Sequence, residues 1–398
     1  MVARMARYGG HVLRERLARR RATGPTDIPV RTNEVTREWL TAVLCAGCPG
    51  AAVEAYEVAE VSSGTTTRWR VRVDYNDDGR DAALPTALFA KTTARWTQRL
   101  LLGTADVLTG EPDFYRHLRP HLEIETPYGY HGAVDPASGR SMVLLEDVAA
   151  TRGAIFRTAQ TPVSRAEMAD LLTGMAGWHG RYWDDPALAR PPFAHRTPDA
   201  FVANLARFAR LRRRGRVGAR RARMVIPDAV VPRYDDLYSA LWRSLELTAE
   251  GPLTLLHGEP HIGNVYRTGA GRMGITDWQL VMRGSWAYDV AYAIVTGLTV
   301  EDRRAWERDL LGSYLGRLTA TGVAAPDFDD AWLAYRQQTL WPYFGRLLAT
   351  GRSLVQPRFP PDPSNFGMLE RAANAVLDLD ALGAVLGAPR RLGQGREA

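Results

Sequence analysis

The sequence predicts an α+β protein built of two lobes. The chain has 398 residues, and at about 100 to 200 residues per domain this length exceeds the needs of one compact domain. Strand-like runs fill the stretch from 53 to 146, whereas helical periodicity prevails beyond it. Strands that are followed by helices, rather than alternating with them, are typical of α+β proteins. We place the lobes at 31–147 and 148–398, after a basic arm at 1–30.

The arm is rich in arginine, as is the whole chain. There are 51 basic residues against 44 acidic ones, a net charge of +7, and Lys91 is the only lysine. Residues 3–21 predict a basic helix. The arm lacks the apolar run of a signal peptide, and no later segment reaches the roughly 18 apolar residues of a membrane span. We therefore expect a cytoplasmic protein with no membrane contact.

The first lobe is predicted to begin with a short helix and to continue as a sheet. Thr36 precedes apolar residues at helical spacing, among them Trp39 and Leu40. Strand-like runs follow at 53–58, 69–75, 87–90 and 142–145, separated by turn clusters such as 76–79 and 135–139. One helix, roughly 103–118, interrupts these strands.

Two compositionally biased segments each allow more than one interpretation. Cys45 and Cys48 form a C-x-x-C without a second Cys or His pair to complete a zinc site, so we expect two reduced thiols. The segment 205–224 carries nine arginines, which indicate either a solvated helix face or an anion-binding surface. Neither the arm nor the segment 205–224 interleaves base-stacking aromatic residues as a single-strand binder does, so nucleic acid is not an expected partner.

The densest group of chemistry-bearing residues lies at 255–279. It reads LLHGEPHIGNVY and, after a turn, GITDWQ. An apolar strand carries Glu259 into a short loop, Asn264 follows five residues later, and a hairpin returns Asp277 to the same end. One carboxylate can orient or deprotonate a hydroxyl, while an amide oxygen and a second carboxylate suit Mg²⁺ beside phosphates. The pattern predicts metal-assisted transfer to a hydroxyl.

The H-G-E-P-H-x-G-N run, together with I-T-D-W, resembles the catalytic segment of the aminoglycoside phosphotransferase and choline kinase-like family, relatives of protein kinases. The resemblance implies a protein-kinase-like fold and a kinase that acts on an alcohol group. It makes Glu259 the catalytic residue, Asn264 and Asp277 the Mg²⁺ ligands, and His257 and Asp289 the supports of the loop. The family usually has Asp where this chain has Glu259.

The same resemblance places a nucleotide site upstream, with ATP or GTP as the phosphate donor. Lys91 takes the position of the lysine that binds the α- and β-phosphates, and Glu111 that of the glutamate that pairs with it. The remaining nucleotide contacts fall on a phosphate-covering turn and on the hinge between the lobes: Ser62, Ser63, Gly64, Glu146 and Val148.

The acceptor is predicted from charge. An arginine-rich helical lobe does not suit a polycation, so we expect a neutral or anionic sugar, a nucleoside-like or other natural product, or a peptide Ser/Thr, in antibiotic resistance or biosynthesis. The candidate substrate contacts are His261, Asp184 and Asp185. The alternative is a nucleotide-binding pseudokinase, because the extra methylene of Glu259 moves its carboxylate by about 1 Å, which can cost about a hundredfold in rate. The sequence predicts no oligomeric state.

Overall fold

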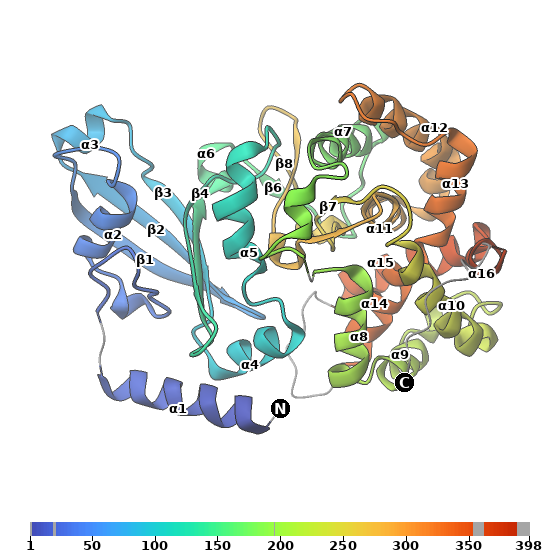
Figure 1. Cartoon of the computed structure of the whole chain (residues 1–398), viewed down its shortest axis with the longest axis horizontal. Coiled ribbons are helices and arrows are strands. Elements are labelled where there is room, and N and C mark those ends of the chain that lie inside the picture. The colour runs from blue at the N-terminus through green and yellow to red at the C-terminus, as the bar shows by residue number, and fades with distance from the viewer. Residues whose placement is uncertain (1, 19–20, 195, 353–361, 388–398) are drawn as a thin grey trace.

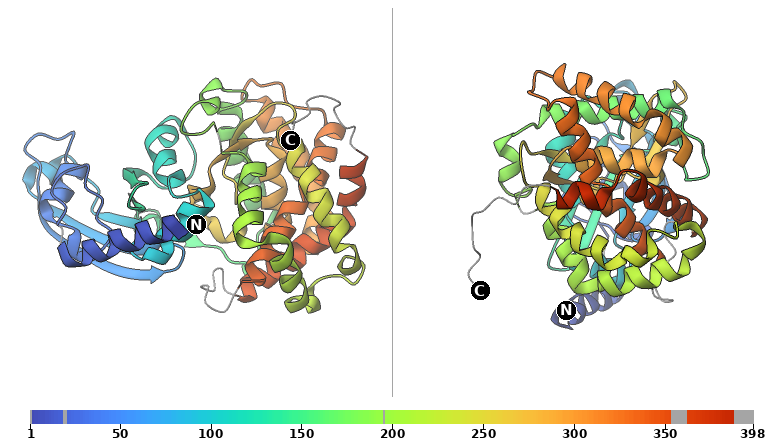
Figure 2. Two further views of the ribbon diagram at one scale, coloured as in Figure 1. Left: turned by 60° about the horizontal axis from the view of Figure 1, so that its bottom comes forward. Right: turned by 90° about the vertical axis from the view of Figure 1, so that its right-hand side faces the viewer.

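The computed structural model describes residues 2–18, 21–194, 196–352 and 362–387. It has the predicted α+β architecture of two lobes, in which an antiparallel sheet with a few helices lies beside a mainly helical body (Figure 1). The two lobes are also distinct in the left view of Figure 2, whereas in the right view the helical body lies in front of the first lobe. Arg19 and Arg20 of the predicted arm, and the end of the predicted second lobe after 387, lie outside the described residues.

The first lobe is built on a five-stranded sheet with the order β1-β2-β3-β5-β4. All of its neighbouring strands are antiparallel. Inward residues of β2 alternate with outward ones, whereas every residue of β5 is buried because it lies between two strands and under the helices. The strands are β1 (Val53–Ser63), β2 (Thr67–Tyr75), β3 (Ala87–Thr92), β4 (Gly129–Asp135) and β5 (Arg140–Glu146).

Two helices of this lobe lie where the sequence predicts them, but one of them does not form an arm. In α2 (Arg37–Leu44), the Thr36 side chain caps the helix by accepting a hydrogen bond from Trp39 N, and Trp39 is buried against the sheet. The predicted basic helix is α1 (Val2–Ala18), but it is packed on the lobe rather than extended as an arm. Its Glu15 lies 2.7 Å from Arg99 and 3.2 Å from Arg140.

The helix predicted at 103–118 is wrong as a single element. Asp106 adopts a left-handed φ of 59° and ends α4 (Trp96–Ala105), after which α5 (Gly110–Asp113) and a π-helical turn (Phe114–Leu118) follow. The turn expected at 76–79 is the short helix α3 (Asp77–Asp81), capped by the Asn76 side chain. Strand β4 was not predicted, because its sequence, GYHGAVD, lacks a clear alternation of apolar and polar residues.

The helical body surrounds α11 (Ala287–Gly297), which is buried at every position. Beside it, β7 (Thr254–Leu256) pairs with β10 (Met282–Gly284), and β6 (Ile155–Phe156), β8 (Val265–Arg267) and β9 (Met273–Ile275) form a small sheet. The other helices are α6 (Val148–Thr151), α7 (Arg165–Arg181), α8 (Pro198–Ala209), α9 (Leu211–Arg221), α10 (Tyr234–Leu247), α12 (Val300–Thr319), α13 (Phe328–Gln337), α14 (Leu340–Thr350), α15 (Asp362–Asp378) and α16 (Ala381–Leu386).

The arginine-rich segment lies on α8 and α9, and several of its arginines are engaged within the protein. Arg212 and Arg216 pair with Asp235, at 2.8 and 2.5 Å. Arg214 and Arg221 donate to main-chain carbonyls near the end of α14. These contacts make part of the segment a structural brace, which neither of the two sequence interpretations included.

Two expectations from composition can be compared with the structure directly. Cys45 is buried, Cys48 is half-buried, and both are free thiols. Within the described ranges, no helix combines the length and the apolar character needed to cross a membrane.

Candidate active site

The loop that follows β7 carries the central motif, and its backbone is tied to the buried helix α11. Asp289, on the first turn of α11, accepts hydrogen bonds from the backbone N–H groups of His257 at 2.6 Å and Gly258 at 3.0 Å. Gly258 has a φ of +86°, and a Cβ there would lie 2.2 Å from the carbonyl oxygen of Leu280. A glycine is therefore required for this backbone path.

His257 links the loop to the hairpin that carries the second carboxylate. Its Nε2 lies 3.0 Å from the carbonyl oxygen of Thr276, the residue before Asp277, and its Nδ1 accepts from Glu259 N–H at 3.3 Å. These two bonds fix the tautomer with the proton on Nε2. Burial lowers the pKa of His257 below its usual value, so the ring is a neutral support between the two acidic residues.

Glu259 lies in the interior of the site with a buried arginine against it. The Glu259 side chain is 32% exposed, and its Oε1 lies 2.5 Å from Nη2 of Arg346, whose side chain is 3% exposed. Burial raises the pKa of Glu259, Arg346 opposes that shift, and Asp277 adds to it. His261 Nε2 is 3.8 Å from the same Oε1. Burial and the nearby Arg346 hold the pKa of His261 well below its usual value.

Asn264 and Asp277 are brought together at the ends of the loop and the hairpin. Asn264 Nδ2 donates to the carbonyl oxygen of Glu259 at 2.9 Å, and this bond turns the amide so that Oδ1 is its remaining polar atom. Thr276 N–H donates to the Asn264 carbonyl oxygen at 2.9 Å, which sets the next residue, Asp277, beside Asn264. Asp277 itself has a left-handed φ of 72°.

Lys91 joins the first lobe to this site. Its Nζ lies 2.7 Å from Glu111 Oε1 and 3.2 Å from Asp277 Oδ1, and the Lys91 and Glu111 side chains are nearly inaccessible. Burial raises the pKa of Glu111, Lys91 opposes that shift, and Asp277 adds to it. Burial also acts to raise the pKa of Asp277, but Lys91 and Arg68 outweigh it and hold that pKa below its usual value. One cation thus bridges two carboxylates from different lobes.

The residues expected to contact the nucleotide belong to the end of β1, to the turn after it, and to the connection that follows β5. Ser62 and Ser63 end β1, and Gly64 begins the turn to β2. Gln98 supports this turn by donating to the Gly64 carbonyl oxygen at 3.1 Å. Glu146 ends β5 and Val148 begins α6, so the two residues form the connection between the lobes. The Glu146 carboxylate is engaged by Arg152 at 2.5 Å, and the Glu146 N–H donates to the Tyr128 carbonyl oxygen at 2.9 Å.

Asp184 and Asp185, the predicted substrate contacts, have structural partners. The Asp184 side chain accepts from Leu253 N–H at 2.8 Å, and the Asp185 side chain caps a short 3₁₀ turn by accepting from Ala187 N–H at 2.8 Å. Leu253 precedes β7, whereas Glu259 follows it, so these contacts lie at the opposite end of that strand. Their role in binding substrate stays a prediction without a contact to support it.

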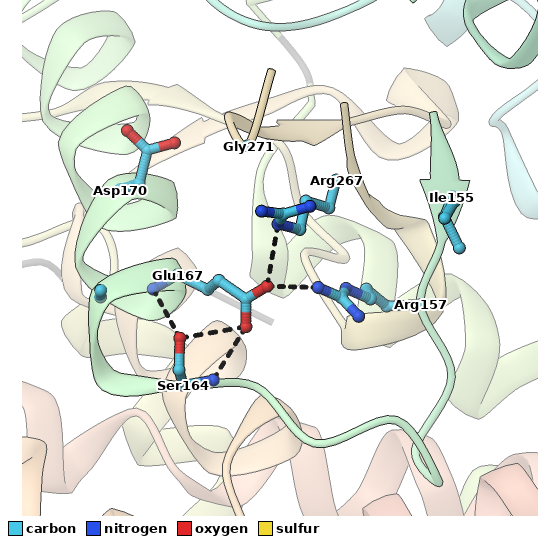
Figure 3. A pocket seen from close by; sticks show the side chains of 8 residues that line it. Ile155, Arg157, Ser164, Glu167, Asp170, Arg267 and Gly271 are labelled. Carbon is cyan, nitrogen blue, oxygen red and sulfur yellow. Dashed lines mark hydrogen bonds and ion pairs between the residues drawn. The ribbon is translucent and has the colours of Figure 1, made fainter. Parts of the chain in front are cut away.

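A hollow of about 470 Å³ lies on the helical body, and none of the predicted site residues lines it (Figure 3). It is lined by Arg157, Glu167 and Arg267, among others. Both arginines pair with Glu167, Arg267 at 3.3 Å. Glu167 also forms a capping box with Ser164 at the start of α7. Glu167 is thus engaged on several sides within the protein, and none of the residues of the motif lines the hollow, so we do not assign it the chemistry of the motif.

Sequence reasoning missed two buried arginines that contact the site. Arg346 belongs to α14 and reaches Glu259 across 87 positions of sequence, and Arg196 reaches Asp113 of α5 across 83. Their neighbours in sequence carry no motif. The one available signal was indirect: an arginine within the apolar run LWPYFGRLL has to find a counter-charge when the helix is buried.

The chain resembles one family model and several solved structures. A family model described as the phosphotransferase enzyme family matches residues 61–349. No curated protein matches the chain. Solved structures with a similar course include a choline/ethanolamine kinase family protein from Mesorhizobium loti, 18% identical, with a TM-score of 0.46 and 88% of this chain and 98% of that chain covered. Choline kinase LicA from Streptococcus pneumoniae is 12% identical, with a TM-score of 0.46 and coverages of 87% and 97%. Macrolide 2′-phosphotransferase from Brachybacterium faecium is 17% identical, with a TM-score of 0.41 and coverages of 84% and 97%.

Proposed function

Because the chain belongs to the phosphotransferase enzyme family, we propose that it transfers the γ-phosphoryl group of ATP or GTP to a hydroxyl group of a small molecule. The observation that carries this proposal is the bridge of Lys91 to Glu111 and Asp277, at 2.7 and 3.2 Å. A cation and a carboxylate from different lobes meet there, next to the loop of Glu259 and Asn264. Phosphoryl transfer needs such an assembly, since its catalysis is mostly positioning and charge stabilisation.

Asn264 and Asp277 would hold Mg²⁺. An amide oxygen and an ionised carboxylate are the hard ligands that this cation prefers, and phosphate oxygens complete such a site. Among the residues that the structure describes, no cluster of three His, Cys, Asp or Glu side chains suits another metal. When bound, Mg²⁺ would neutralise charge on the phosphates.

The residues of the first lobe would hold the donor. Lys91 would bind the α- and β-phosphates, with Glu111 fixing its position. The backbone of Ser62, Ser63 and Gly64 would cover the phosphates, and the backbone of Glu146 and Val148 would hydrogen-bond the base.

Glu259 would orient the acceptor hydroxyl and accept its proton during transfer. A carboxylate with a raised pKa is a stronger base than an ordinary one, and burial raises the pKa of Glu259. Neutral His261, 3.8 Å from that carboxylate, is suited to contact the acceptor as a hydrogen-bonding group. Because the buried Arg346 lies against Glu259, we propose a neutral or anionic acceptor, such as a sugar, a nucleoside-like compound, another natural product or a peptide Ser/Thr.

Consumption of Mg·ATP and Mg·GTP, measured with and without a panel of hydroxyl acceptors, tests the proposal. We expect Glu259→Gln and Asp277→Asn to lose turnover by a hundredfold or more, on the order of what one electrostatic contact contributes to catalysis. Asp309→Asn is a matched control, because Asp309 is 66% exposed on α12 and pairs with the exposed Arg165. Equal turnover in Asp277→Asn and Asp309→Asn would refute the proposed metal site.

The Glu259–Arg346 pair also supports a second candidate, a pseudokinase that binds nucleotide without turnover. In that case the arginine would occupy the carboxylate permanently. Calorimetric binding of Mg·ATP or Mg·GTP to wild type, with no turnover of any acceptor, would favour this candidate. Absence of nucleotide binding would exclude both candidates.

A further inference from the structure

We propose that Arg346 is a positioning residue for Glu259, and that the arginine-rich helix α9 braces the helix that carries Arg346. The inference rests on the proposed function, in which Glu259 orients the acceptor hydroxyl. It gives a task to the arginine-rich segment that the sequence alone left open.

The first step is the contact itself. Arg346 Nη2 donates to Glu259 Oε1 at 2.5 Å and to the Tyr292 hydroxyl at 3.0 Å. Its Nε and Nη1 are buried and have no partner within the described residues. A buried cation is costly unless it is paired, so Glu259 is what makes the buried guanidinium tolerable. The contact occupies one carboxylate oxygen and leaves Oε2 for the acceptor hydroxyl.

The second step concerns the length of the Glu259 side chain. The family usually has Asp at this position, and an aspartate on the same backbone would place its oxygens about 1 Å farther from Arg346. That gap would break a charge-assisted hydrogen bond of ordinary length. Glutamate at 259 and arginine at 346 therefore form a matched pair.

The third step is the surroundings of the carboxylate. Besides Arg346 from α14, the groups that face Glu259 are His261 from its own loop, Asp277 from the hairpin, and Tyr288 and Tyr292 from α11. The histidine is neutral, the tyrosines are neutral and Asp277 repels. Among these groups, Arg346 is the cation that contacts the carboxylate, so it sets the orientation.

The fourth step is the brace on α14. Arg221 Nη1 donates to the carbonyl oxygens of Thr350 and Arg352 at 3.0 and 2.7 Å, and Arg214 donates to that of Gly351 at 3.4 Å. Cations on the last carbonyls of a helix stabilise its C-terminus. The two helices also touch closely, since a Cβ at Gly218 would lie 2.1 Å from the Leu347 carbonyl oxygen.

Steady-state turnover of Mg·ATP or Mg·GTP with the best acceptor of the panel tests the inference in wild type, Arg346→Met, Arg346→Lys, Glu259→Asp and the double variant Arg346→Met/Glu259→Asp. The control is Arg303→Met, because Arg303 is 1% exposed and ion-paired on α12. It reports the loss of a buried arginine away from Glu259.

We expect Arg346→Met to lower kcat about a hundredfold, with the nucleotide KM within about threefold of wild type. Arg346→Lys keeps the charge without the planar fork, so its kcat should be about tenfold higher than that of Arg346→Met. Glu259→Asp should fall about as far as Arg346→Met, and the double variant no farther, because both changes break one unit.

Several results would overturn the inference. Unchanged kcat in Arg346→Met refutes the positioning role, and a raised kcat shows that the arginine sequesters Glu259. Equal losses of kcat in Arg303→Met and Arg346→Met, with no recovery of kcat in Arg346→Lys, would show that Arg346 acts only by stabilising the fold. Full activity in Glu259→Asp would show that Glu259 and Arg346 are not a matched pair. If the wild type itself turns over no nucleotide, that result refutes the proposed function, and the inference, which rests on it, is refuted with it.

Discussion

Replacing Arg196 with methionine should loosen α5, the helix that carries Glu111. Arg196 lies in the helical body just before α8, is 8% exposed, and bonds both Thr109 and Asp113 through Nη2. These two residues flank Glu111 in sequence. Arg196 therefore latches the helical body to the part of the first lobe that holds Lys91 of the proposed nucleotide site.

The magnitude follows from the burial of the pair. The Arg196 and Asp113 side chains are 7% and 13% exposed. At a separation of about 3 Å and an effective dielectric constant of about 20, unit charges attract by about 5 kcal/mol, and desolvation offsets most of that. Arg196→Met leaves Asp113 buried without its cation, which should lower the free energy of unfolding by about 3 kcal/mol. In Arg196→Met/Asp113→Asn no charge is stranded, so that loss should shrink by about 2 kcal/mol.

Urea denaturation of wild type, both single variants and the double variant measures this coupling, and the KM for Mg·ATP reports the nucleotide site. We expect the KM of Arg196→Met to rise, since Glu111 is less well held. Arg165→Met is the control, because its pair with Asp309 is more than half exposed on both sides and should change stability by at most about 1 kcal/mol. Single-variant losses that add within about 0.5 kcal/mol in the double variant would refute the latch.

Two further predictions concern the loop and the acid stability of the fold. Gly258→Ala should abolish turnover and cost more than about 2 kcal/mol in urea denaturation, whereas Gly251→Ala, at a similar φ of 79° but with nothing within 4 Å, should cost only about 1 kcal/mol and keep turnover. Burial lowers the pKa of His131 from 6.5 to about 4, so the unfolded chain binds the proton first and stability is lost as pH falls below 6.5 toward 4. His131→Phe should therefore lose about 2 to 3 kcal/mol less than wild type between pH 7 and pH 4.5; equal losses in both proteins would contradict the assignment to His131.

Those features that depend on neighbours in sequence were predictable. The helix after Thr36 was visible because a capping residue and its apolar stripe lie within a few positions. The turn-rich run around Glu259 was visible for the same reason, since its glycines, histidine, amide and carboxylates stand at fixed short spacings. The family resemblance of this motif then implied the pairing of Lys91 with Glu111, and the two side chains do meet at 2.7 Å.

Features that depend on distant partners were not predictable. Charge density marked α9 as unusual, but it did not reveal that Arg221 would cap the end of α14, 129 positions away. Asp184 and Asp185 looked available because their partners are backbone N–H groups, which have no signature in sequence. The end of α4 at Asp106 was missed for a similar reason. Asp106 has a left-handed backbone conformation, whereas the apolar periodicity of the sequence continues past it.

The distribution of cations ties these observations together. Arginine reaches several acceptors at once at three buried places. Arg99 donates through Nε, Nη1 and Nη2, as its planar fork allows, whereas Arg346 and Arg196 each reach two acceptors through Nη2. Lys91 is the exception. It lies in the narrow space between Glu111 and Asp277, with both carboxylates within 3.2 Å of one nitrogen. A compact ammonium can exchange a carboxylate for a phosphate oxygen by a small rotation, whereas a guanidinium has to move its whole plane. In the proposed function, the single lysine of the chain therefore supplies a point charge at the donor phosphates.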